Sequence, residues 1–123
     1  MDPDELAALD FCYVTTTGRR SGHAHTIEIW FAAAEAGIYV LSGGGDNSDW
    51  VRNIRANPTV ALRVGDRDMI TKAHVVEDEN EDQLARGLLV EKYTPRYDGD
   101  LSEWGRTALP VAIVFPPAES SPS

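Results

Sequence analysis

The sequence contains little that would crosslink the chain or place it in a membrane. Of its 123 residues one is a cysteine, Cys12, which excludes an intramolecular disulfide and disfavours a cysteine-based zinc site. No run of about 18 apolar residues occurs, so a transmembrane helix is not expected. The acidic start, Met-Asp-Pro-Asp-Glu, lacks the positive region of a signal peptide. These absences predict a cytoplasmic protein.

Positive charge is also scarce. The formal net charge of -9 disfavours a nucleic-acid-binding protein, which would present a basic face. An arginine side chain offers a rigid fork of donors that suits phosphate or carboxylate. The arginines of the middle segment therefore indicate a small anionic ligand, with solvated surface ion pairs as the alternative. They occur as three pairs: Arg19 and Arg20, Arg52 and Arg55, and Arg63 and Arg67.

The pattern of apolar residues predicts a single small domain that is mainly β. The chain has the length of one domain, and 42% of its residues are hydrophobic, enough for a core. Alternating and β-branched runs predict six strands, and capping patterns predict two or three short helices. Short links favour a largely antiparallel barrel. We expect this domain over residues 1–115, followed by a disordered tail over residues 116–123. The predicted strands cover residues 11–17, 25–32, 38–41, 59–64, 69–76 and 111–115.

Helix boundaries follow from capping residues and prolines. Asp2 is the expected N-cap of a helix through about residue 9. Ser48 is the expected N-cap of a helix over residues 49–56, and Asn80 opens a helix to about residue 92, with Leu84 and Leu88 inward. An irregular segment over residues 94–110 contains one helical turn at 102–105. A tight turn over residues 65–68 joins two strands.

The turn between the first two predicted strands, Gly18-Arg-Arg-Ser-Gly22, carries the strongest binding signal. Its glycines allow a tight exposed turn. The side chains of Arg19, Arg20 and Ser21 are donors suited to an anion. A polar hairpin loop without a ligand is the alternative.

A glycine-rich segment, Ser42-Gly-Gly-Gly-Asp46, precedes the helix predicted at 49–56. The free N–H groups at a helix N-terminus can hold an anionic group. The segment is not a dinucleotide-binding pattern, because Ser48 stands where the last glycine of that pattern belongs. On the helix, Trp50 and Asn53 share a face. Trp50 either packs in the core or flanks a planar ring.

Histidine and tyrosine side chains are the remaining candidates for chemistry. His23 and His25 alternate on a strand, but no third ligand lies close in sequence, so we expect hydrogen-bond donors rather than a metal site. Tyr93 and Tyr97 are either proton donors in a pocket or packing residues. No Ser/His/Asp or Cys/His catalytic pattern is present. The parts that are present suit the binding of a large anionic organic molecule.

These segments resemble a known family. Thr15-Thr-Thr-Gly-Arg-Arg-Ser-Gly22, Trp50-Val-Arg-Asn-Ile-Arg-Ala-Asn-Pro58 and Trp104-Gly-Arg-Thr-Ala-Leu-Pro110 are similar to motifs of the deazaflavin-dependent nitroreductases. The likeness spans roughly residues 11–115. It implies a split β-barrel that binds coenzyme F-420, an 8-hydroxy-5-deazaflavin whose tail carries a phosphate and glutamates. His25 stands where the family often has a basic residue.

The resemblance also implies roles for individual residues. The turn would grip the phosphate tail through Arg19, Arg20 and Ser21. Tyr97 is the expected proton donor or substrate orienter, and Tyr93 is the second candidate. The deazaflavin ring would be surrounded by His25, Thr26, Ile27, Glu28, Ser42, Gly43, Gly44, Gly45, Trp50 and Asn53.

We therefore predict an oxidoreductase that transfers a hydride from reduced coenzyme F-420 to an electron-poor small molecule, namely an activated alkene, a quinone or a nitro compound. One alternative is a reductase that uses FMN on the same barrel. Another is a non-catalytic protein that binds the deazaflavin or a different anionic metabolite. We expect no metal, no nucleic acid and no integral membrane segment. We also expect a homodimer, because split barrels of this type often pair.

Overall fold

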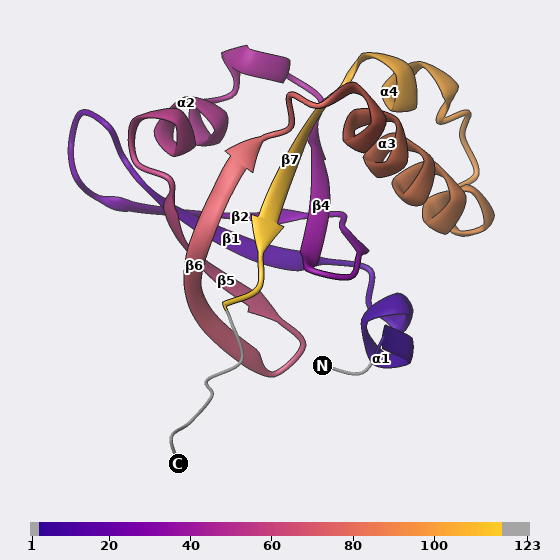
Figure 1. Ribbon diagram of the computed structural model, residues 1–123, viewed down its shortest axis with the longest axis horizontal. Coiled ribbons are helices and arrows are strands. Elements are labelled where there is room, and N and C mark those ends of the chain that lie inside the picture. The colour runs from indigo at the N-terminus through magenta and orange to yellow at the C-terminus, as the bar shows by residue number, and fades with distance from the viewer. Residues whose placement is uncertain (1–2, 117–123) are drawn as a thin grey trace.

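The computed structural model describes residues 3–116, which form one curled sheet with helices around it (Figure 1). Seven strands follow the order β2-β1-β5-β6-β7-β4-β3, and every neighbouring pair is antiparallel. The predicted fold class is confirmed, with one more strand, because residues 25–32 divide into β2 and the two-residue β3. The elements are α1 (Pro3–Ala8), β1 (Cys12–Thr17), β2 (Ala24–Ile29), β3 (Ala32–Ala33), β4 (Gly37–Ser42), η1 (Gly45–Asn47), α2 (Asp49–Ala56), β5 (Thr59–Val64), β6 (Arg67–Val75), α3 (Glu79–Tyr93), η2 (Thr94–Arg96), α4 (Ser102–Thr107) and β7 (Leu109–Val114).

The two ends of the sheet are tied together by the chain itself. β2 and β3 lie at opposite ends of the strand order, yet only Trp30 and Phe31 separate them in sequence. The Cα atoms of Ile29 and Ala32 are therefore at most about 11 Å apart, whatever the curvature of the sheet. The sheet has to curl until its ends approach. Among the described strands β2 pairs with β1 alone, so its outer edge stays open and the barrel is split there.

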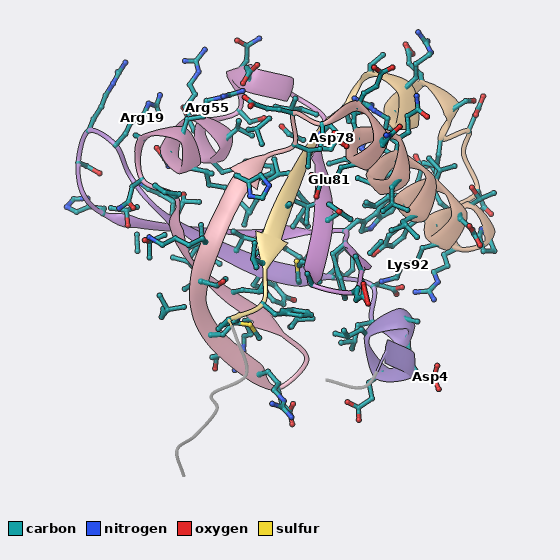
Figure 2. All side chains as sticks on the ribbon, in the orientation of Figure 1. Asp4, Arg19, Arg55, Asp78, Glu81 and Lys92 are labelled. Carbon is teal, nitrogen blue, oxygen red and sulfur yellow. The ribbon has the colours of Figure 1, made fainter. Side chains whose placement is uncertain are left out.

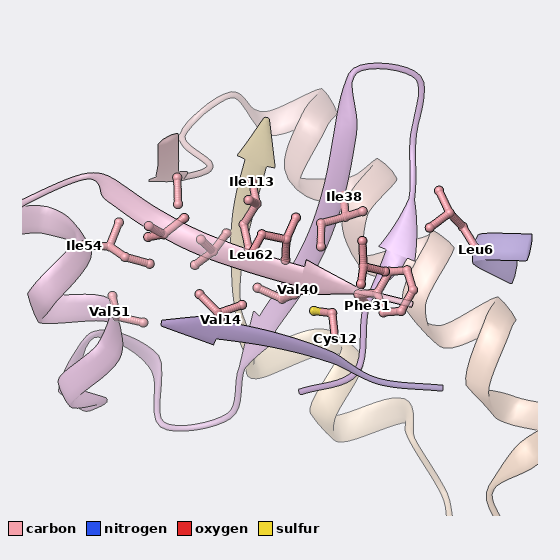
Figure 3. Packing of buried hydrophobic residues seen from close by; sticks show 14 residues of the cluster. Leu6, Cys12, Val14, Phe31, Ile38, Val40, Val51, Ile54, Leu62 and Ile113 are labelled. Atoms are coloured by element: carbon pink, nitrogen blue, oxygen red, sulfur yellow. The ribbon is translucent and has the colours of Figure 1, made fainter. Parts of the chain in front are cut away.

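Apolar side chains fill the inside of the curled sheet (Figure 3). Cys12 and Val14 point inward from β1, and Leu62 meets them from β5. Val51 and Ile54 of α2 cover one end of this cluster. The bounds of α2 and β5 match the predicted ranges, because a proline-containing link, Asn57-Pro58, separates a helical pattern from an alternating one.

β4 is buried on both faces, which explains its uninterrupted apolar sequence. Ile38 and Val40 belong to the cluster inside the sheet. Tyr39 and Leu41 belong to a second cluster on the outer side, where α3 packs. A strand covered on both faces has no position left for a solvated side chain.

The buried face of α3 differs from the prediction. Leu84 is 51% exposed, and Leu88 is only partly buried. The inward stripe is instead Ala85, Leu89 and Tyr93, spaced four residues apart. The small side chain of Ala85 lets the helix lie close to the sheet, and a pattern of leucines does not reveal this.

Two local boundaries were also predicted wrongly. Asp78, rather than Asn80, caps α3, because its carboxylate accepts the Glu81 N–H at 2.9 Å. The hairpin between β5 and β6 has a loop of only two residues, since Val64 pairs with Arg67. Gly65 opens this loop with φ +63, a conformation that glycine adopts at little cost.

Some predictions concern parts of the chain that the structure does not describe. Asp2, the expected N-cap, and the tail from residue 117 onward lie outside the described residues. The single-domain boundary at residue 115 and the disordered tail stay predictions. Over residues 3–116, no helix is both long and apolar enough to cross a membrane.

Candidate functional site

A groove of ≈ 370 Å³ lies between the β1–β2 turn, the start of β2 and the first turns of α2. Figure 2 shows Arg19 on this turn, which projects beside α2. The groove is formed by segments that are about 30 residues apart in sequence and that the motifs had singled out. Its lining is Thr16, Gly18, Arg19, Arg20, Ser21, His25, Ile27, Asp49, Trp50 and Asn53.

The turn is built by short backbone contacts that require glycine. The Gly18 N–H donates to the His23 carbonyl at 2.7 Å, and the Gly22 N–H donates to the Gly18 carbonyl at 2.9 Å. Gly22 has φ +75. A Cβ on Gly18 would lie 2.8 Å from Ser21 Oγ and 2.9 Å from His25 Nε2. Glycine at position 18 therefore lets Ser21 and His25 approach the backbone.

Asn53 joins the turn to α2. Its Oδ1 accepts the Arg19 backbone N–H at 3.1 Å and Arg19 Nη1 at 2.9 Å. Its Nδ2 donates to Thr16 Oγ1 at 3.1 Å, at the end of β1. The Arg19 guanidinium also pairs with Asp49 at 3.3 Å. Arg19 and Asn53, both predicted site residues, are thus hydrogen-bonded to each other.

The other donors of the turn face the groove without partners. Arg20 is exposed, and neither the Arg20 nor the His25 side chain makes a hydrogen bond or ion pair with any other residue in the range 3–116. Ser21 Oγ accepts the His23 N–H at 3.1 Å, which leaves its own proton available. Within the same range, no cluster of His, Cys, Asp or Glu could hold a metal ion. The donors that remain fit a phosphate group.

An aromatic hollow of ≈ 460 Å³ lies at the other end of β2, in the split of the barrel. Two carboxylates, those of Glu28 and Asp100, line it. The Glu28 carboxylate accepts a hydrogen bond from the Tyr13 hydroxyl at 2.8 Å. Hydrogen bonds from Ser102 lower the pKa of Asp100. No lysine or arginine of the described chain lines the hollow, so its charge disfavours an anionic ligand. The lining is Phe11, Glu28, Ile29, Trp30, Leu41, Tyr97, Asp100, Leu101 and Trp104.

Trp30 is the centre of this hollow. Its ring stacks on Tyr93, with ring centres 4.2 Å apart and an interplanar angle of 1°. Tyr97 and Trp104 meet it edge-on at 5.6 Å and 5.5 Å. Tyr97 is 49% exposed and has ring contacts only, so its hydroxyl is available to a ligand.

Tyr93 was wrongly considered a proton donor. It is 1% exposed, and its hydroxyl accepts the Phe31 N–H at 3.0 Å. The same hydroxyl lies within hydrogen-bonding distance of the carbonyls of Asp10 and Phe31, at 2.8 and 2.9 Å. Burial raises the pKa of Tyr93 to about 12. Its hydroxyl serves the backbone and has no access to a substrate.

Lys92 was missed by the sequence analysis. Its Nζ donates to the Phe31 carbonyl at 2.9 Å and lies 3.8 Å from the centre of the Phe31 ring. Burial, together with the charge of Arg96, lowers the pKa of Lys92 to about 8. The only sequence signal was its position in the last turn of a helix beside Tyr93.

The glycine-rich segment lines neither the groove beside α2 nor the aromatic hollow. Ser42 is 1% exposed, and its hydroxyl contacts the Gly45 carbonyl at 3.1 Å and Ser48 Oγ at 2.8 Å. A Cβ on Gly44 would lie 2.5 Å from Ser48 Oγ. Ser48 is the N-cap by position, but its side chain bonds Ser42 rather than the helix. The expectation that Ser42, Gly43, Gly44 and Gly45 surround a ring is not supported.

Alternation along β2 separates the four residues expected around the ring. His25 and Ile27 face the groove. Thr26 points to the outer face of the sheet, where its hydroxyl contacts that of Thr15 at 2.6 Å. Glu28 is on that side as well and reaches the aromatic hollow at the strand's end.

Comparison with known proteins identifies the family of this chain. The family model described as F420H2-dependent quinone reductase, where F420H2 is reduced coenzyme F-420, matches residues 4–116. This chain belongs to that family. It is a deazaflavin-dependent oxidoreductase, and its cofactor is coenzyme F-420.

Relatives of this F420H2-dependent reductase are known in sequence and in structure. An F420H2-dependent quinone reductase of Mycobacterium tuberculosis is 30% identical over 103 residues, which cover 80% of this chain and 67% of the relative. A solved F420-H2 dependent reductase is 25% identical, with a TM-score of 0.64 over 86% of this chain and 94% of its own. A structure described as a domain-swapped dimer is 27% identical, with a TM-score of 0.66, and the match covers 93% and 87% of the two chains.

Replacing Tyr93 by Phe tests the structural assignment. Tyr93→Phe removes a hydroxyl that satisfies the buried Phe31 N–H, and we expect it to lower the free energy of unfolding by about 1–3 kcal/mol. Chemical denaturation measures this. Tyr97→Phe is the matched control, because its hydroxyl makes no bond within residues 3–116, and it should leave the midpoint unchanged. Equal midpoints for both variants would contradict the assignment.

Proposed function

We propose that this reductase acts on quinones, with the phosphate tail of the cofactor in the groove beside α2 and the quinone in the aromatic hollow. The observation that carries this is the position of the two sites on one strand. Ile27 lines the groove and Ile29 lines the hollow. Residues two apart on a strand project from the same face about 7 Å apart. A cofactor anchored in the groove would therefore reach the edge of the hollow.

The groove fits the anionic tail of the cofactor. Arg20, the Ser21 hydroxyl and the His25 ring are free to donate to a ligand. Arg20 and Ser21 lie on the turn that α2 holds in place, and His25 lies beside them at the start of β2. Trp50 adds a flat apolar wall at the same groove. Beyond it, the edge of β2 that faces away from β1 carries backbone groups that no described strand satisfies, and these suit the polar edge of a deazaflavin.

The hollow fits an uncharged planar acceptor. Trp30 and Trp104 supply flat and edge-on aromatic contacts, which favour a conjugated ring. Leu101 and Leu41 extend the apolar surface beside these rings. A quinone, which is planar and carries polarised carbonyl oxygens, matches this lining.

When bound and reduced, the deazaflavin supplies a hydride from C5, and the protein contributes orientation and a proton. A quinone that accepts a hydride needs one proton for the oxygen on which negative charge develops. A tyrosine hydroxyl can donate its proton in a hydrogen bond as well as accept one. We propose that Tyr97 Oη donates this proton or orients the carbonyl, since it is the exposed hydroxyl at the hollow.

The choice of cofactor is tested by binding titrations. Coenzyme F-420 should bind more tightly than FMN, and Arg20→Ala should weaken its binding about tenfold or more, because a charge-assisted hydrogen bond contributes ~1.5–3 kcal/mol. Arg67→Ala removes the same charge from the β5–β6 hairpin and should have no effect. Tighter binding of FMN would overturn the assignment. An unchanged affinity in Arg20→Ala would leave the turn as an ordinary hairpin loop.

The role of Tyr97 is tested by steady-state reduction of a quinone. Tyr97→Phe should lower kcat about tenfold or more and leave the affinity for coenzyme F-420 intact, since general acids contribute ~10²–10⁴-fold and water replaces part of that. Equal turnover would make Tyr97 a packing residue. A wild-type protein that binds the cofactor but turns over no quinone, alkene or nitro compound would be a carrier instead.

We also propose that the chain forms a homodimer. The support is the related solved structure described as a domain-swapped dimer. Sedimentation equilibrium at micromolar concentration should show a species of twice the 13.5 kDa chain mass. A single species at the chain mass would refute this. The cytoplasmic location expected from the sequence stays a prediction.

A further inference from the structure

The two arginines of the β1–β2 turn differ in the hydrogen bonds and ion pairs that they make within the chain. Arg19 has its backbone N–H and Nη1 on Asn53 and its Nη2 on Asp49. The side chain of Arg20, its neighbour, makes no hydrogen bond or ion pair within residues 3–116. One arginine therefore fastens the turn to α2, while the next extends into the groove.

Asn53 is the group that does the fastening. It is 3% exposed, although it is an amide on the first helix after the turn. Both donors on its oxygen side come from Arg19, which fixes Oδ1 toward the turn and Nδ2 toward Thr16. The amide thereby joins three segments: the end of β1, the turn and α2. Both hydrogen bonds on its Oδ1 come from Arg19 and one Nδ2 hydrogen is on Thr16, so the buried amide offers a ligand at most its second Nδ2 hydrogen.

We propose that Asn53 is a positioning residue of the tail site. It holds Arg19 against α2, so that Arg20, Ser21 and His25 converge on one phosphate group. This inference rests on the proposed function and replaces the expectation that Asn53 contacts the deazaflavin ring. The tail, rather than the ring, is the part of the cofactor whose binding depends on Asn53.

Asp49 allows a test in which cofactor binding is expected to strengthen rather than weaken. Its carboxylate lies at the groove and pairs with Arg19, and its side chain is 84% exposed. Removing that negative charge makes the groove more attractive to an anion. Asn53→Asp keeps an acceptor for Arg19 and adds a negative charge, so it weakens anion binding through charge alone. Asn53→Leu, of similar size, removes the contacts with Arg19 and Thr16 and therefore tests the positioning itself.

The experiment compares two ligands across three variants. Coenzyme F-420 and the same deazaflavin without its phosphate tail are titrated by fluorescence into wild type, Asn53→Asp, Asn53→Leu and Asp49→Asn. Asn53→Asp and Asn53→Leu should weaken binding of coenzyme F-420 about tenfold or more. The same two variants should bind the tail-less deazaflavin as wild type does. Asp49→Asn should bind coenzyme F-420 at least as tightly as wild type.

The outcomes separate this inference from the proposed function. A wild type that binds both ligands equally has no tail site, and the proposed function fails. A wild type that prefers the tail, with the same preference in Asn53→Asp and Asn53→Leu, refutes the role of Asn53. Equal losses for both ligands in Asn53→Asp and Asn53→Leu would show a general structural role and also refute it.

Discussion

The two-residue link between β2 and β3 is the constraint on which the rest of the structure depends. It ties together the two ends of a seven-stranded sheet, so the sheet closes without a hydrogen-bonded seam. The last turn of α3 holds this link from outside, because the Tyr93 hydroxyl and the Lys92 ammonium both bind the Phe31 carbonyl. Trp30, which directly precedes Phe31, is thereby held in place at the split of the barrel. The same link that closes the barrel also places the aromatic surface of the hollow.

β2 performs two tasks because one of its edges is left open. Its start carries His25 beside the turn, and its end carries Ile29 beside Trp30, so one short strand connects a polar groove to an aromatic hollow. A strand paired on both sides would offer only side chains to a ligand. An open edge adds backbone donors and acceptors at fixed spacing. Ile27 and Ile29 anchor this strand on the buried cluster.

Local sequence patterns were enough to predict most helices and strands. The contacts that build the site, however, join residues far apart in the sequence. α2 and β5 were predicted to the residue, because caps, a proline and strict alternation all act within a few positions. The face of α3 was predicted wrongly, since Leu84 and Leu88 suggested the apolar stripe but the buried stripe begins at the small residue Ala85. The contact of Tyr93 with Phe31 spans 62 residues, and that of Asn53 with Arg19 spans 34. A single sequence holds no local signal for either.

The pairing of β4 has a consequence for synthesis. Apart from the two residues of β3, its partner is β7, which lies about 70 residues further along the chain. Because a ribosome adds ~5–20 residues each second, Ile38 to Leu41 wait several seconds before that partner is made. During this time a strand whose six residues are all buried in the folded protein has unpaired edges. Chaperone capture of the nascent chain is therefore expected to concentrate on this segment and to end once β7 has emerged.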